Sequence, residues 1–241
     1  MSLSSGLVAA YDIQASGATW LDLTSGGHDV PLTNTDWVAE GLRSNANGEY
    51  GTLNNSSQVV SGSTCTVVVY YKSLSAFADS TIRNILTNNI TNGRILGKYS
   101  DNTLWLYIQD GVTSHYIRVQ SSDVPNWLTG TQIAFQWDIN NTIHGGYKLA
   151  INIDGTYVTP VGAVRADNFA AHIVPDLAFL NDLSNTANEA NGIIGYGFVF
   201  NNIKTASELS EMAADHSNVL EEYFNQGQNN NSNSVSVMVG L

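Results

Sequence analysis

The sequence has few charged residues, one cysteine, four prolines and no long apolar run. Charged residues make up 12% of the chain, about half the share that is usual in soluble proteins. The single Cys65 excludes an internal disulfide, and its place in an apolar run predicts a small buried side chain. No run reaches the roughly 18 apolar residues of a membrane-spanning helix, and residues 1–12 show no pattern typical of a signal peptide.

Basic residues are scarce as well. Lysine and arginine together number 9 against 21 for aspartate and glutamate, which gives a formal net charge of -12. A field of this sign repels phosphate groups, so the sequence predicts neither nucleic acid nor an anionic membrane as a partner. The five histidines are scattered, without the spacing that is typical of a metal site.

What the sequence has in quantity is apolar residues, at 43%, together with many Asn, Ser, Thr and Gly. These polar residues tolerate turns and suppress helix, so the composition favours many short strands. Strand-like runs bounded by turn residues occur at 6–12, 19–23, 30–32, 42–44, 49–53, 65–72, 84–87, 94–99, 103–109, 114–120, 132–139, 147–154, 156–159, 176–180 and 192–200. The pattern predicts an all-β domain, built as an antiparallel two-sheet sandwich.

The hydrophobic period changes once, near the C-terminus. Thr205 and Glu208 fit a capping box, and apolar residues recur after them at helical spacing. We predict a helix over residues 205–215. Whether residues 217–224 continue it is left open.

The end of the chain has a different composition. Residues 225–233 are almost all Asn, Gln, Ser or Gly and predict a flexible polar linker. The alternating residues that follow fit a strand with one buried face, namely Val235, Val237 and Val239. Because such a strand needs a partner, we expect it to form an interface with a neighbouring copy in a homo-oligomer. The predicted organisation is therefore a domain of residues 1–224 and a tail of residues 225–241.

Four parts of the sequence resemble one family when they are taken in order. They are GLVAAYD with WLDLTSGGHD at 6–12 and 20–29, the strand at 64–72, the hairpin at 132–138 and 148–155, and the closing strand and helix at 195–211. Together they resemble laminin-G-like domains, which implies a concanavalin A-like jelly roll over residues 5–224. The closing strand lacks the family's usual acidic residue, and Asn201-Asn202-Ile203 replaces Asn-Arg-Ala. The resemblance is therefore carried to the fold and not to a detailed function.

The clearest hairpin signal is Asp110-Gly111, between two of the predicted strands. Strand alternation and the two-residue turn place several aromatic residues and one arginine on the same face. Aromatic rings beside an arginine can stack on sugar rings while polar groups bond the hydroxyls. We predict a ligand-binding surface formed by Trp105, Tyr107, Tyr116 and Arg118. The alternative is that the first two of these side chains fill the core or a subunit contact.

One loop is rich in oxygen ligands. Asp22, Thr24 and Asp29, with nearby carbonyl groups, could hold a calcium ion, and relatives of this fold often bind one near such a loop. The alternative is a loop closed by its own side chain to backbone hydrogen bonds, without an ion. Apart from this calcium site, the sequence predicts no cofactor.

Catalytic motifs are missing from the sequence. Glucanases resemble this fold and need two carboxylates beside the scissile bond, which appear on a strand as Glu-x-Asp-x-x-Glu. The sequence contains no such triplet, no G-x-S-x-G and no P-loop. It therefore predicts a protein that is not an enzyme.

Two functions from different classes fit these observations. The first is a virion accessory protein of a bacteriophage, as a capsid decoration, head-fibre or tail component that binds the particle surface and host glycans. The acidic composition and the missing leader favour it, with assembly in the host cytoplasm. The second is a secreted, extracellular lectin-like module that binds carbohydrate. The expected partners are virion proteins or a cell-surface glycan, without nucleic acid or membrane insertion.

Overall fold

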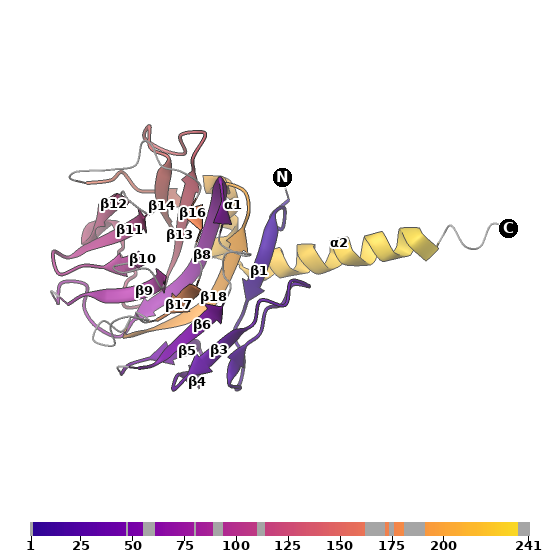
Figure 1. Ribbon diagram of the computed structural model, residues 1–241, viewed down its shortest axis with the longest axis horizontal. Coiled ribbons are helices and arrows are strands. Elements are labelled where there is room, and N and C mark those ends of the chain that lie inside the picture. Colours follow the sequence, from indigo (N-terminus) through magenta and orange to yellow (C-terminus); the bar gives the residue numbers. More distant parts are fainter. Residues whose placement is uncertain are drawn as a thin grey trace.

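A computed structural model describes residues 2–46, 48–54, 61–79, 81–88, 94–109, 114–161, 172–173, 176–180 and 191–235. Two antiparallel sheets pack face to face, and two helices near the C-terminus lie beside them (Figure 1). The all-β, two-sheet antiparallel sandwich predicted from the sequence is confirmed.

We name each sheet after a central strand. The β18 sheet contains, in spatial order, β15 (Thr156–Tyr157), β14 (Leu149–Ile153), β13 (Thr131–Asp138), β8 (Thr64–Ser73), β18 (Gly192–Phe200), β5 (Gly41–Ser44) and β4 (Asp36–Val38), and β1 (Leu7–Tyr11) also pairs with β18. The β11 sheet contains β12 (Ser114–Gln120), β11 (Thr103–Gln109), β10 (Arg94–Lys98), β9 (Arg83–Asn88), β17 (Asp176–Phe179), β6 (Tyr50–Asn54), β3 (Val30–Thr33) and β2 (Thr19–Trp20). A short pair joins β7 (Ser61–Gly62) to β16 (His172–Ile173). Of these strands, the sequence did not predict β4, β7 and β16.

The main core lies between the two sheets and takes alternate residues of each strand. In β8, Val67 and Val69 join this core, whereas Val68 points to the opposite face of the sheet. Cys65 is also in the core, as predicted, and its burial raises the pKa of the thiol. The thiol is thus an inert packing group.

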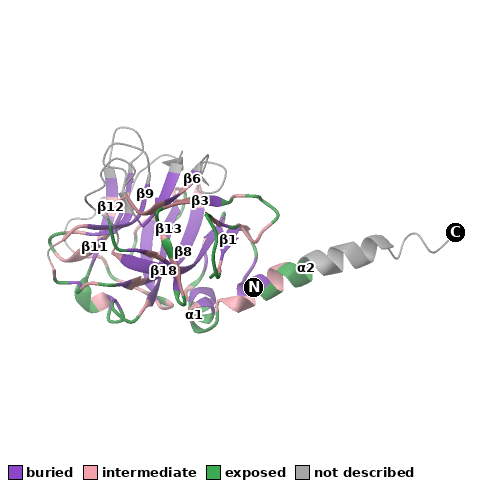
Figure 2. Ribbon diagram, turned by 90° about the horizontal axis from the view of Figure 1, so that it is seen from below, coloured by how far each residue is buried: buried purple, intermediate pink, exposed green. Residues whose placement is uncertain are grey.

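A second apolar cluster lies on the other face of the β18 sheet, where the two helices pack (Figure 2). The sheet contributes Phe198 and Phe200 of β18, and the helices contribute Leu209, Met212, Val219 and Leu220. With one face on the main core and the other under the helices, all nine residues of β18 are buried. This accounts for its nearly continuous apolar sequence.

The first helix, α1 (Ala206–Ala214), agrees with the helix predicted at 205–215. Thr205 Oγ1 accepts a hydrogen bond from the Glu208 amide at 3.3 Å, and Glu208 Oε2 accepts one from the Thr205 amide at 2.8 Å. These two bonds are the predicted capping box, and they satisfy amides that the first turn leaves unpaired.

A buried lysine ties the N-terminus to this helix. Lys204 Nζ donates to the carbonyl oxygens of Leu3 and Ser5, each at 2.8 Å, and lies 4.5 Å from the centre of the Phe200 ring. Its side chain is fully buried, and the desolvation lowers the pKa of its amine. The N-terminal turn therefore depends on a cation supplied from the start of α1.

The second helix, α2 (Ser217–Val235), corrects the linker predicted at residues 225–233. Val219 and Leu220 anchor its first turn against the sheet, and the helix then extends away from the sandwich (Figure 1). Starting a helix is the unfavourable step, whereas each residue added to it forms one more hydrogen bond. A run of Asn, Gln and Gly can therefore continue a helix that it would not start.

An ion cluster lies at the end of β9 and β10. Lys98, whose side chain is 0% exposed, donates through Nζ to Asp79 Oδ1 at 2.5 Å and to the Thr81 carbonyl at 2.8 Å. Arg83 donates to Asp79 Oδ2 at 2.9 Å. Partial burial raises the pKa of the Asp79 carboxyl, but the hydrogen bonds from Lys98, the Thr81 amide and Arg83 outweigh it and lower the pKa to about 2.

We expect Asp79→Asn to lower the free energy of unfolding by about 3–5 kcal/mol at neutral pH, because it leaves the Lys98 charge buried without a counter-ion. Urea unfolding followed by tryptophan fluorescence measures this change. The folded-state pKa lies below that of the unfolded chain. The stabilisation should therefore be fully present above about pH 4 and be lost as the pH falls through about 2.

The matched control is Asp36→Asn, which breaks an exposed pair with Arg43. An exposed pair contributes at most about 1 kcal/mol. Equal losses of stability in the two variants would contradict a special role for the buried cluster.

Candidate functional site

Strands β11 and β12 form the predicted hairpin, and their register shows which side chains share a face. Trp105 lies opposite Arg118, and Tyr107 lies opposite Tyr116. The alternate residues of both strands fill the main core, namely Leu104, Leu106, Ile108, Ile117 and Val119. The four side chains predicted as a ligand surface point away from the core and are partly exposed. The structure therefore does not place Trp105 and Tyr107 in the core.

Three of the predicted residues are in mutual contact, and a fourth residue, Tyr99, joins them. Trp105 stacks on Tyr99 with ring centres 4.3 Å apart, and on Tyr116 with ring centres 5.0 Å apart. The guanidinium carbon of Arg118 lies 4.8 Å from the Trp105 ring centre and 6.0 Å from that of Tyr116. We call these four residues the aromatic cluster. Tyr107 shares their face beside Tyr116.

Polar groups hold the cluster in one orientation. Trp105 Nε1 donates to Thr103 Oγ1 at 2.5 Å, and that hydroxyl donates to Asp101 Oδ1. Asp101 Oδ2 lies 3.5 Å from a terminal nitrogen of Arg118. Within the part of the chain that the structure describes, Arg118 Nε has no acceptor. One donor of the cluster is thus left without a partner of its own.

The sequence did not single out Tyr99, Asp101 or Thr103. The signal for Tyr99 was strand alternation, because Gly97 of β10 lies opposite Trp105 and Tyr99 follows two residues later on the same face. Asp101 lies in the turn between β10 and β11 and Thr103 begins β11, and their side chains bond each other. Nothing in their spacing distinguishes them from ordinary turn residues.

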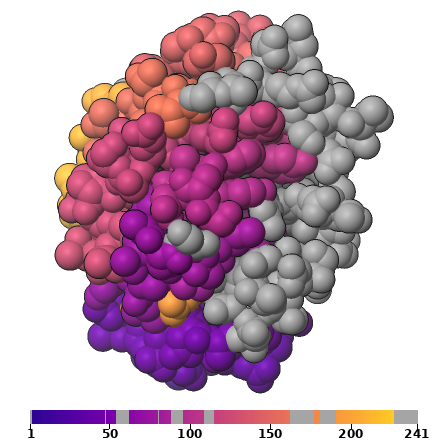
Figure 3. Space-filling model, turned by 90° about the vertical axis from the view of Figure 1, so that its left-hand side faces the viewer, coloured from indigo at the N-terminus to yellow at the C-terminus, as the bar shows by residue number. Residues whose placement is uncertain are grey.

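The cluster lies on the side of the sandwich away from the helices. Both helices pack on the β18 sheet, whereas the cluster is on the outer face of the β11 sheet. Figure 3 shows the molecule from the side on which β10, β11 and β12 lie. A ligand can approach the cluster from this side without displacing α1 or α2.

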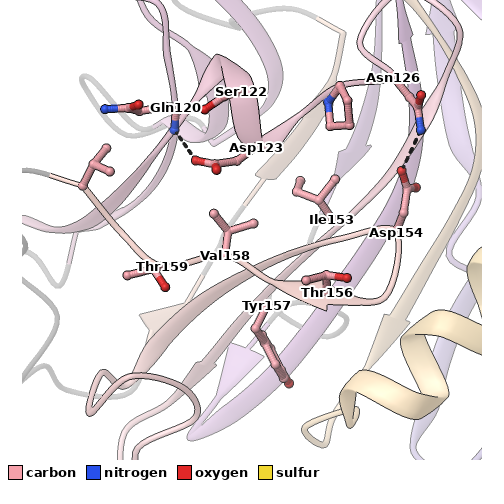
Figure 4. Close-up of a pocket in the computed structure, with 12 residues that line it drawn as sticks. Gln120, Ser122, Asp123, Asn126, Ile153, Asp154, Thr156, Tyr157, Val158 and Thr159 are labelled. Carbon is pink, nitrogen blue, oxygen red and sulfur yellow. Dashed lines mark hydrogen bonds between the residues drawn. The ribbon is translucent and has the colours of Figure 1, made fainter.

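A cavity of about 670 Å³ lies next to the end of β12 (Figure 4). Three segments form its wall. The first runs from the end of β12 through the short helix η2 (Ser121–Asp123) to Pro125 and Asn126. The second is the turn from β14 to β15, and the third is the chain that follows β15. Figure 4 shows Ile153 and Val158 between Asp123 on one side and Asp154 on the other. The sequence analysis did not identify this cavity.

The carboxylates at the cavity take part in local structure. Asp154, at φ 48° in a tight turn with Gly155, accepts hydrogen bonds from the Gln132 amide at 2.7 Å and from Asn126 Nδ2 at 3.3 Å. Asp123 Oδ2 accepts from the Gln120 amide at 2.9 Å. Both side chains therefore brace the turns that form the cavity wall.

The loop predicted to bind calcium is closed by its own donors. Asp22 Oδ1 accepts from the amides of Ala10 and Thr24, and Oδ2 accepts from the Thr24 hydroxyl and the His28 amide, at 2.9–3.1 Å. Asp29 Oδ1 accepts from the Asp22 amide at 2.8 Å. This is the geometry of the alternative without an ion, although Asp22, Thr24 and Asp29 do lie together as predicted.

The described residues hold neither a group suited to a metal ion nor a helix suited to a membrane. No group of three or more His, Cys, Asp or Glu side chains in these parts of the chain is arranged to hold a metal ion. No helix among the described residues is both long and apolar enough to cross a membrane. Of the predicted interface residues, Val235 is the last residue of α2, and Val237 and Val239 lie outside the described residues.

No family model and no curated protein matches this sequence. Solved structures do match it. The sialidase of Trypanosoma rangeli bound to a difluoro-nononic acid aligns with a TM-score of 0.64 and 12% identity over 88% of this chain. The same sialidase in complex with sialic acid aligns with a TM-score of 0.63 and 11% identity over 88% of this chain. The binding domain of botulinum neurotoxin serotype D/C aligns with a TM-score of 0.63 and 10% identity over 88% of this chain.

The chain spans 33% of the sialidase chains and 53% of the neurotoxin chain. At these identities the likeness shows the fold alone, a lectin-like β-sandwich. The jelly-roll resemblance seen in the sequence is thus confirmed at the level of the fold.

We expect the thermal unfolding midpoint to be the same in excess calcium and in EDTA, because the oxygens of Asp22 are already occupied by four donors. Asp22→Ala should lower the free energy of unfolding by about 1–3 kcal/mol, because it leaves several donors without an acceptor. Asp29→Ala removes an acceptor that bonds one amide and should have a smaller effect. A calcium-dependent rise of the midpoint, lost in Asp22→Ala, would show that the ion-binding interpretation is right.

Proposed function

We propose that this protein is a non-enzymatic carbohydrate-binding domain that holds its ligand at the aromatic cluster. The observation that carries the proposal is the stack of Tyr99, Trp105 and Tyr116 beside Arg118 on a partly exposed sheet face. Aromatic rings give a sugar an apolar contact area, and an arginine donates to its hydroxyl groups. The ring edges, the partly exposed Tyr116 and the terminal nitrogens of Arg118 are the groups that a sugar would meet.

The matching structures support this class of ligand. Two of them are a sialidase with a bound sugar acid, and another is the binding domain of a neurotoxin. The match concerns the sandwich and not the identity of its surface residues. Carbohydrate binding by this chain therefore rests on its own cluster, with the fold as support.

A binding role without catalysis fits the carboxylates near the site. Most families of glycosidases use one carboxyl group as the acid and another as the base or nucleophile. Asp101 and Asp123 accept hydrogen bonds from Thr103 and Gln120, two and three residues away in the chain. Asp154 accepts one from the Gln132 amide of strand β13. The sequence also has no Glu-x-Asp-x-x-Glu strand.

The biological setting that we propose is a bacteriophage particle, on which the domain serves as a decoration, head-fibre or tail component. This proposal rests on the charge-poor, acidic composition. On a particle, many weak sites acting together would bind a host glycan far more tightly than one. A secreted lectin-like module is the alternative setting for the same site.

Trp105→Ala should weaken binding to the best ligand on an array of immobilised saccharides about 30-fold, which corresponds to about 2 kcal/mol. The substitution removes the ring that contacts Tyr99, Tyr116 and Arg118. Circular dichroism should show that the variant is folded, because the side chain lies outside the core.

Phe224→Ala is the matched control, since it removes an exposed aromatic ring on α2. It should bind as the unchanged protein does. Equal affinity of the two variants for every saccharide would reject the cluster as the binding site.

The protein should release no reducing sugar from the saccharides that it binds, because the carboxylates described near the site accept hydrogen bonds from backbone amides of the fold. A reducing-end assay with the purified protein measures this. Sustained release that is abolished by Asp123→Asn would show that the domain is an enzyme.

A further inference from the structure

The outer face of the β11–β12 hairpin connects the aromatic cluster to the cavity. Three cross-strand pairs follow one another along this face: Tyr107 with Tyr116, Trp105 with Arg118, and Thr103 with Gln120. Gln120, a member of the last of these pairs, is also part of the cavity wall.

The chain after β15 brings the far wall of the cavity to the same place. The Val161 amide donates to the Arg118 carbonyl at 2.8 Å, and Val161 lines the cavity. Arg118 and Gln120 are two residues apart on one strand, which is about 7 Å. The cluster and the cavity therefore share a rim, and a ligand larger than one sugar can contact both.

The cavity wall combines two kinds of surface. Pro125, Ile153 and Val158 give it apolar area. Ser122 and Thr159 are exposed and offer hydroxyl groups. A sugar unit needs both, because its ring has apolar faces and its hydroxyls need partners.

The electrostatics of the cavity and the cluster disfavour an acidic ligand. Among the described residues, those that line the cavity include two aspartates and no lysine, arginine or histidine. The single arginine of the cluster already lies beside Asp101. The net charge of -12 adds a repulsive field for any anion.

We propose that the ligand is a neutral oligosaccharide chain, with one part on the aromatic cluster and the next sugar units in the cavity beyond Gln120. The proposal rests on the carbohydrate-binding function proposed above and specifies the length and charge of the ligand. Sugar units that enter the cavity add contacts with its wall, which includes Ile153, Val158 and the hydroxyl of Thr159. Affinity should therefore rise with chain length.

The test uses the full chain and oligomers of glucose, galactose, mannose and N-acetylglucosamine, from single sugars to hexasaccharides, with sialylated and uronic acid oligomers of the same lengths. For the best neutral series, the hexasaccharide should bind at least about tenfold more tightly than the single sugar. Neutral oligomers should bind more tightly than acidic ones of equal length.

Thr159→Trp fills the cavity and should remove most of the gain in affinity with length. Ser122→Trp fills it from the opposite wall and serves as a second variant if the first is poorly folded. The matched control is Thr142→Trp, which places the same ring on the exposed loop between β13 and β14, at the other end of β14 from Asp154. It should keep the full dependence on length.

The outcomes separate the two proposals. Affinity that does not depend on chain length, an unchanged dependence in both cavity variants, or tighter binding of acidic oligomers would overturn the extended neutral ligand. Binding at the cluster would then still stand, provided that Trp105→Ala weakens it as expected. If no saccharide binds, the proposed carbohydrate-binding function is itself wrong.

Discussion

Every second side chain of β11 and β12 is buried between the two sheets, and the candidate site depends on this alternation. Leu104, Leu106 and Ile117 are almost wholly buried between the sheets. Each such side chain contributes about 1.5–3 kcal/mol when it is removed from water. A slip of one residue would expose them and would force Trp105 and Arg118 inward, where a charged group is costly to bury. The core therefore sets which side chains face outward at the candidate site.

The two sheets use their outer faces differently. Strand β18 is buried on both sides of its sheet, because the outer face carries Phe198 and Phe200 under α1 and α2. The capping box of α1 and the bonds from Lys204 to the N-terminal turn hold that layer in place. The outer face of the β11 sheet carries Trp105, Tyr116 and Arg118 instead. One face of the sandwich thus serves stability and the other is available for binding.

Features that depend on residues close together in the chain could be predicted from the sequence. Alternation in residues 103–120 predicted the hairpin, its inner face and three members of the cluster, and the capping pattern predicted α1. Features that depend on distant segments could not. The cavity is formed by three segments that only the fold brings together, and α2 continues through a composition that does not favour helix. The Asp22 loop has the same oxygen atoms with or without calcium, so its sequence could not distinguish an ion site from a loop closed by its own amides.

The side chains of the aromatic cluster are already held in place in the protein alone, and this affects the free energy with which the cluster would bind a sugar. An exposed aromatic side chain that must be fixed by its ligand loses rotamer freedom at that moment, at about 0.5–1.5 kcal/mol for each side chain. Here the ring of Trp105 is held before any ligand arrives, by Tyr99 and Tyr116 on the ring and by Thr103 on its nitrogen. Asp101 likewise orients Arg118. The cost of ordering these groups is thus part of folding and not of binding, so that a shallow surface with few contacts can still hold a sugar.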